Sequence, residues 1–238
     1  MLKIMKRAMT SIIMVALVTL MSVAQERYEV KVGDFTRLSV IDNVNVNYRC
    51  NADSAGIAVF TATKEIADAL TFNNSGNGRL SIQVYDDFGR LGKLPDITIY
   101  SNALEEAENS GDSILRISQL PPMKNFKVRL TDNGKVIARG LRSSRLELQI
   151  LSGKGKIIAT GTCDDWDLRL VGTGEIQADG VTATNVSCRI MGTGRIGCDV
   201  NGGLLKVSGS GTGKVYYKGT PSKVTVRKLG TIKAIPME

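Results

Sequence analysis

The chain has 238 residues, 42% of them hydrophobic, and carries a formal net charge of +8. This length allows one large domain or two small ones, and the hydrophobic share excludes a globally disordered chain. The chain contains no histidine, which excludes serine–histidine catalysis, and its scattered positive charges and 5% aromatic residues are not typical of a nucleic-acid binder.

The first residues are typical of a secretory signal peptide. Three basic residues within the first seven precede an apolar run over residues 9–23, and Ser22 and Ala24 supply small side chains at its exit. This order predicts a signal peptide over residues 1–24, with an uncleaved membrane anchor as the alternative. No later apolar run reaches the ~18 residues that a membrane-spanning helix needs. We therefore expect an exported protein in the periplasm, at the cell surface or outside the cell, without a transmembrane segment in the mature chain.

Residues 28–100 predict short strands in which apolar and polar residues alternate. The expected strands span residues 28–32, 37–41, 44–48, 57–60, 79–85 and 97–100. Between them, residues 64–70 place Ile66, Ala69 and Leu70 at helical spacing and predict a short helical turn. We expect the non-repetitive segment before residue 130 either to cap the fold that follows or to begin it with less regular coils.

From about residue 131 onward the sequence repeats about every twenty residues. Each copy has an anchor glycine followed by a charged and a β-branched residue, and the anchors are Gly134, Gly155, Gly174, Gly194 and Gly213. A second glycine follows six residues later in four copies, whereas the fourth copy has Val200 there. Each copy therefore predicts a glycine turn, a short strand, a second turn and another alternating strand, with glycines at corners that need a positive φ or a close backbone approach.

A twenty-residue unit without a helix buries its apolar side chains only by stacking on similar units. Stacking places equivalent residues in columns about 4.8 Å apart. One inward column is predicted to contain Val136, Ile157, Ile176, Ile196 and Val215. An antiparallel sandwich has no reason to repeat one pattern at every twentieth residue, and a β-propeller repeats at about twice this period.

The predicted fold class is therefore all-β, a parallel β-helix or solenoid with coils of about 20 residues. We expect one β-helix domain over residues 25–238, with less regular coils over 28–130 and regular glycine-anchored coils over 131–238. A set of basic residues and a proline is expected to protect the last coil from pairing with other chains. These residues are Lys223, Arg227, Lys228, Lys233 and Pro236.

The four cysteines have irregular spacing and no histidine partner, which argues against a zinc site. Buried thiols or one disulfide are expected, and the spacing does not choose the pairing. The four residues are Cys50, Cys163, Cys188 and Cys198.

Two acidic clusters are the candidates for chemistry. Asp86 and Asp87 form one, and Asp164, Asp165 and Asp167 form the other, with Trp166 and Arg169 beside it. Paired carboxylates, often with calcium and a basic residue, serve enzymes that cleave polysaccharides. Solvated turns also favour aspartate, and Trp166 can equally pack in a core. We expect no catalytic, cofactor-binding or metal-binding residues, and leave open whether the region around Asp164, Trp166 and Asp167 is a site.

Several segments resemble a known family. They are residues 35–48, the Gly78–Ile82 strand, residues 96–100 followed by Leu104, and the Gly-Thr-Gly-x-Ile copies. In these segments the chain is similar to the exported proteins described as putative auto-transporter adhesins with a head GIN domain. The resemblance implies a right-handed parallel β-helix on an envelope or secreted protein, and it implies no residue-level site. The sequence departs from the family pattern around residues 105–130 and at Lys154.

A long stack with flat outer sheets suits weak, multivalent contact with glycans or surface proteins. We therefore predict an adhesin-like surface interaction protein without catalytic activity, which uses no cofactor and binds no nucleic acid. The alternatives are a carbohydrate-active β-helix enzyme, similar to polysaccharide lyases or hydrolases, and a structural envelope scaffold that stacks end to end. The sequence predicts neither the ligand nor the oligomeric state.

Overall fold

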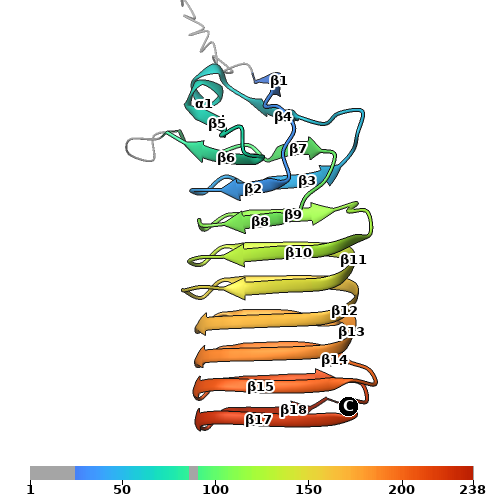
Figure 1. Ribbon diagram of the computed structural model, residues 1–238. Coiled ribbons are helices and arrows are strands. Elements are labelled where there is room, and N and C mark those ends of the chain that lie inside the picture. Colours follow the sequence, from blue (N-terminus) through green and yellow to red (C-terminus); the bar gives the residue numbers. More distant parts are fainter. Residues whose placement is uncertain (1–24, 86–90, 238) are drawn as a thin grey trace, which may run out of the picture.

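The structure, a computed structural model, describes residues 25–85 and 91–237. These residues form a parallel β-helix in which successive coils stack along one axis (Figure 1). Val136 pairs with Ile157, and Ile157 pairs with Ile176, in parallel strands. The offset between paired residues is therefore close to twenty, which confirms the predicted fold class and repeat.

Each coil has two long sides. The anchor side carries the strands that follow the anchor glycines, and the opposite side completes the coil. In stacking order the anchor side contains β7 (Ile97–Ser101), β3 (Val46–Cys50), β9 (Ile114–Ser118), the first residues of β11 (Lys135–Ile150), β12 (Lys156–Gly172) and β13 (Glu175–Gly192), then β14 (Arg195–Val200), β16 (Lys214–Lys218) and β18 (Lys233–Pro236). The opposite side contains β6 (Arg79–Val84), β2 (Arg37–Val40), β8 (Glu106–Asn109), β10 (Met123–Leu130), the last residues of β11, β12 and β13, then β15 (Leu204–Gly211) and β17 (Lys223–Gly230).

The predicted inward column is confirmed. Its five members are paired coil by coil and their side chains are fully buried. The column continues toward the N-terminus through Leu115, Val46 and Ile97, which are also fully buried. A branched aliphatic side chain at one position therefore serves every coil, because each coil offers it similar neighbours above and below.

The anchor side and the opposite side are joined differently from the prediction. The predicted second turn is wrong for three copies, because β11, β12 and β13 each run through the second glycine as one bent strand. The ladder between β11 and β12 shifts register between Ala138 and Leu141, which marks a bulge at Gly140. Beyond the bend a short third side buries Leu141, Cys163 and Val181.

The glycine pairs at the sharper corners have two distinct physical roles. Gly192, two residues before its anchor, has a φ of 130°, which a residue with a Cβ rarely adopts. Gly194, the anchor, has no such φ, but a Cβ there would lie 2.5 Å from the carbonyl oxygen of Gly174 in the coil before. The first glycine therefore supplies conformation, and the second allows coils to approach closely.

The first coils do not follow the order of the chain. β2 pairs on one edge with β6 and on the other with β8, and β3 pairs in the same way with β7 and β9. The coil of residues 37–50 is therefore inserted between the coil of residues 79–101 and the coil of residues 106–118. Figure 1 shows this inversion, with β2 and β3 lying between β6–β7 and β8–β9.

A cap covers the N-terminal end of the stack. Its strands, β1 (Glu26–Lys31), β4 (Ile57–Ala62) and β5 (Leu70–Asn74), pair antiparallel, β1 with β4, β4 with β7 and β5 with β6. The helix α1 (Lys64–Ala69) confirms the predicted helical turn, begins at the N-cap Thr63 and buries Ile66. Phe60 stacks between Tyr28 and Phe72, with ring centroids 5.4 and 6.0 Å away. Antiparallel strands and aromatic rings thus close this end of the core.

At the other end, β17 and β18 form the last coil that the structure describes. Val224 and Val226 occupy inward positions but are 38% and 40% exposed, since no coil among the described residues covers them. The basic residues expected to protect this coil lie exposed on β17 and β18. The predicted signal peptide, residues 1–24, lies outside the described residues. Among the helices described, none is long and apolar enough to span a membrane.

Candidate functional site

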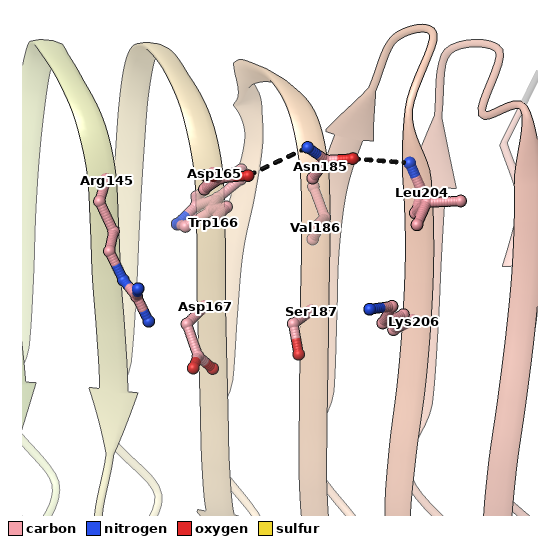
Figure 2. A pocket seen from close by; sticks show the side chains of 9 residues that line it. All are labelled: Arg145, Asp165, Trp166, Asp167, Asn185, Val186, Ser187, Leu204 and Lys206. Carbon is pink, nitrogen blue, oxygen red and sulfur yellow. Dashed lines mark hydrogen bonds between the residues drawn. The ribbon is translucent and has the colours of Figure 1, made fainter.

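A hollow of about 330 Å³ lies on the opposite side of the coils, beside the bend, across β11, β12, β13 and β15 (Figure 2). We call it the corner hollow. It is lined by Arg145, Asp165, Trp166, Asp167, Asn185, Val186, Ser187, Leu204 and Lys206. Four successive coils contribute to it, so its composition follows from stacking rather than from any continuous motif.

Two outward columns supply its polar side chains. Arg145, Asp165 and Asn185 are in register in the first. In the second, which we call the hollow column, Glu147, Asp167, Ser187 and Lys206 follow one another coil by coil. These side chains point outward because the residues between them in each strand point into the core. Stacked strands place the members about 4.8 Å apart along the axis.

Trp166 contributes packing at this site. It stands in register between Leu146 and Val186, and its side chain is only 2% exposed. Its Nε1 has no hydrogen-bond partner among the described residues. Of the two roles that the sequence left open for Trp166, the structure supports core packing, and the indole offers no open face for a sugar ring to stack on.

Asp165 has a structural partner within the hollow. Its Oδ1 accepts a hydrogen bond of 3.0 Å from the Asn185 side-chain amide, and the Asn185 Oδ1 accepts one of 3.0 Å from the backbone N–H of Leu204 (Figure 2). This chain links three successive coils at the edge of the hollow. The carboxylate of Asp165 is therefore engaged in holding the strands in register.

The remaining polar groups are available to a ligand. Among the described residues, Asp167, Ser187 and Lys206 form no side-chain hydrogen bond or ion pair. Arg145 contacts only Glu147, at 3.7 Å, and its side chain remains 58% exposed. Figure 2 shows Asp167, Ser187 and Lys206 side by side on adjacent strands. A cation, an acceptor and a hydroxyl thus face solvent together.

The structure separates the residues of the predicted acidic cluster. Asp165 and Asp167 line the hollow, whereas Asp164 is exposed outside it and Arg169 is not part of its lining. Asp86 and Asp87, the other cluster, lie outside the described residues. Residues 25–85 and 91–237 contain no group of three or more acidic, cysteine or histidine side chains placed to hold a metal ion.

Arg145, Asn185 and Lys206 were not singled out from the sequence. Each lies about twenty residues, or two such steps, from the aspartates, so the repeat register itself was the signal that could have found them. The positions 145, 165, 185 and 147, 167, 187 are related by one coil each.

Two buried thiols near the site, those of Cys163 and Cys188, have raised pKa values. All four cysteines are free, and Cys163, Cys188 and Cys198 are buried. Burial, followed by the charges of Asp164 and Asp165, raises the pKa of Cys163 to about 12. A hydrogen bond with Cys198, together with burial, raises the pKa of Cys188 well above its ordinary value. The thiols of Cys163 and Cys188 therefore stay protonated at neutral pH.

Comparison with known proteins identifies relatives. A family model described as "Putative auto-transporter adhesin, head GIN domain" matches residues 34–221. A solved putative adhesin from Bacteroides fragilis NCTC 9343 is 20% identical, with a TM-score of 0.78 over 90% of this chain and 97% of that one. A putative adhesin from Parabacteroides merdae ATCC 43184 is 19% identical, with a TM-score of 0.70 over 90% and 96%.

A third similar structure, from Parabacteroides distasonis ATCC 8503, is described as a putative lipid binding protein. It is 20% identical, with a TM-score of 0.70 over 90% of this chain and 97% of that one. At these identities the similarity shows a common fold. A search of curated proteins found no match.

Proposed function

Because this chain belongs to the head GIN domain family of putative auto-transporter adhesins, we propose that it is an exported surface interaction protein that binds glycans. The corner hollow is its binding site. The observation that carries this proposal is the set of polar side chains in the hollow, since Asp167, Ser187 and Lys206 face solvent together without a partner among the described residues.

The arrangement suits a hydroxylated ligand. A sugar hydroxyl both donates and accepts hydrogen bonds, so it can donate to the carboxylate of Asp167 and accept from the ammonium group of Lys206. Hydrogen bonds to charged groups contribute more than those between neutral groups. The hollow is shallow and lacks an exposed aromatic ring, so each contact is weak. Several copies on one surface, or several sugars on one chain, would raise the total affinity.

The test is binding of the purified protein to an array of bacterial and host glycans. We expect Asp167→Ala and Lys206→Ala each to lower the affinity for a bound glycan by about tenfold, because each removes a charge-assisted hydrogen bond. Gln177→Ala is the matched control, since Gln177 is exposed on the anchor side. A protein that binds no glycan, or variants that bind as well as the unaltered protein, would contradict the proposal.

A second candidate function is carbohydrate cleavage, favoured by the presence of Asp165 and Asp167 in one hollow. Asp165 is held by Asn185, so Asp167 is the carboxylate available to act as an acid or base. This function predicts release of new sugar ends from polysaccharides and its loss in Asp167→Asn. Inactivity on a broad panel of acidic and neutral polysaccharides, with calcium present, would end this candidate.

A further inference from the structure

A third outward column lies beside the hollow column on the opposite side. It contains Gln149, Arg169, Arg189, Ser208 and Arg227 in register, and we call it the arginine column. Its members lie two residues after those of the hollow column in each strand, so the two columns share one face. Arg169 and Arg189 are direct neighbours across adjacent coils. Two like charges so close repel each other unless an anion lies between or upon them.

The same column is neutralised further toward the N-terminus. There Arg129, which pairs with Gln149, forms an ion pair of 2.6 Å with Glu106, and Glu106 also contacts Arg79 at 3.0 Å. In contrast, Arg169, Arg189 and Arg227 form no ion pair within the described part of the chain. The Nε of Arg169 is buried and has no hydrogen-bond partner there. These three guanidinium groups thus have no ion-pair partner in the part of the chain that the structure describes.

Positive charge accumulates over the last coils. Residues 200–237 contain seven basic residues and no acidic one. Of the seven, Lys218 alone has an ion-pair partner among the described residues, Asp179 at 3.2 Å. Lys206 belongs to the hollow column, and Arg227 belongs to the arginine column. Lys223 also lies on the opposite side, whereas Lys214, Lys218 and Lys233 lie on the anchor side, so the last coils are positive on both long sides and favour an anionic partner at this end.

The neighbouring hollow column limits what kind of anion fits. Asp167 and Ser187 stand beside Arg169 and Arg189, so carboxylate and hydroxyl acceptors alternate with guanidinium groups across the face. A polyphosphate chain would bring negative charge against Asp165 and Asp167. Neither column contains an aromatic residue on which nucleic-acid bases could stack. A linear sugar polymer, with many hydroxyls and sparse negative charges, matches both columns.

We propose that this face of β12, β13, β15 and β17 binds a linear polysaccharide that carries carboxylate or sulfate groups. Arg169 and Arg189 hold the anionic groups, while Asp167 and Ser187 accept hydrogen bonds from hydroxyls. The inference rests on the proposed function, and it names the ligand class of that site. It extends the site from the corner hollow along the coils toward Arg227.

The experiment measures binding of the full protein to polygalacturonate, which carries carboxylates, and to dextran sulfate, with neutral dextran and a single-stranded DNA oligonucleotide alongside. We expect binding to at least one of the two anionic polysaccharides and much weaker binding to dextran and DNA. The double variant Arg169→Gln/Arg189→Gln is expected to lower that affinity by about 100-fold, roughly tenfold for each charge-assisted contact. Raising NaCl from about 0.05 M to about 0.5 M should weaken binding by tenfold or more.

The matched control is Arg195→Gln/Lys214→Gln, which removes two stacked, exposed cations from the anchor side. It should change the affinity less than about threefold, because its charges lie on the other face. Equal losses in both double variants would show attraction by net charge alone and would overturn the proposal. Binding of DNA or neutral dextran as tight as that of the anionic polysaccharides would also overturn it.

The result separates this inference from the proposed function. Neutral glycans that bind through Asp167 and Lys206, without dependence on Arg169 or Arg189, would leave the proposed function standing and refute the anionic ligand. Absence of binding to every neutral and anionic glycan would refute both. A cooperative thermal unfolding transition in each double variant is the control for correct folding. The salt dependence of binding by the unaltered protein tests the same charges without any substitution.

Discussion

Shortening Ile157 to alanine tests the inward column directly. Ile157 is fully buried between Val136 and Ile176. Ile157→Ala removes three buried carbon groups, worth about 2.4 kcal/mol at ~0.8 kcal/mol for each. Backbone hydrogen bonds fix the spacing between neighbouring coils, so the cavity left by the shorter side chain closes only in part. The remaining cavity adds a further loss of stability. We expect the free energy of unfolding to fall by about 3–4 kcal/mol.

Ile158→Ala is the matched control in the same strand. Ile158 points outward on the anchor side and is only partly buried, so we expect its truncation to cost less than about 1.5 kcal/mol. Urea unfolding followed by circular dichroism measures both variants against the unaltered protein. A loss for Ile158→Ala equal to or larger than that for Ile157→Ala would mean that the strand faces the other way, and it would refute the assignment of the column.

Three further predictions concern corners, a thiol and an ion-pair cluster. Gly194→Ala should lower the free energy of unfolding by about 1–3 kcal/mol, because the added Cβ would collide with the preceding coil. Gly197→Ala should leave thermal unfolding unchanged, because the added Cβ would lie 3.6 Å from its nearest neighbour. Equal effects of the two substitutions would contradict the close-approach argument. The raised pKa of Cys163 stabilises the fold fully below its ordinary value of 9.0, and this contribution is lost as pH rises toward about 12. Urea unfolding at about pH 8 and pH 11 should therefore show a smaller pH-dependent loss in Cys163→Ala than in the unaltered protein; identical losses would argue against it. Glu106→Gln removes the charged partner of Arg79 and Arg129, so the free energy of unfolding measured in urea should fall by about 1 kcal/mol at low salt and by less at high salt. A loss of stability that does not depend on salt would mean that the ion pairs contribute nothing.

The regular coils were predictable from the sequence because each repeats one local pattern in one environment. The glycine anchors, the β-branched positions and their spacing specify the fold and the column from Val136 to Val215. The same spacing could also have predicted which residues line the corner hollow, since positions 145, 165 and 185 are one coil apart. The role of Trp166 was left open, although the alternation of Leu168 and Leu170 with Arg169, extended by two residues, would have placed it on the inward face.

The repeat does not predict the order of the first coils or the cap, because both depend on pairing between strands far apart in the chain. Alternating strands in residues 28–100 fit a coil or a cap equally well. The alternation of apolar and polar residues indicates which face of a strand is buried, but it does not indicate which other strand pairs with it. The insertion of the coil of residues 37–50 between later coils, and the antiparallel cap, depend on contacts between strands far apart in the chain.

The repeat was enough to predict a parallel β-helix with coils of about twenty residues, since only stacking buries the apolar side chains of such a repeat. The tertiary structure decided which outward side chains share a face and which charges are neutralised. Arg129 and Arg189 occupy one column and have the same chemistry, yet Glu106 forms an ion pair with Arg129 and not with Arg189. Charge compensation depends on which coil lies next to which, and that order is set by pairing across the stack rather than by any local pattern.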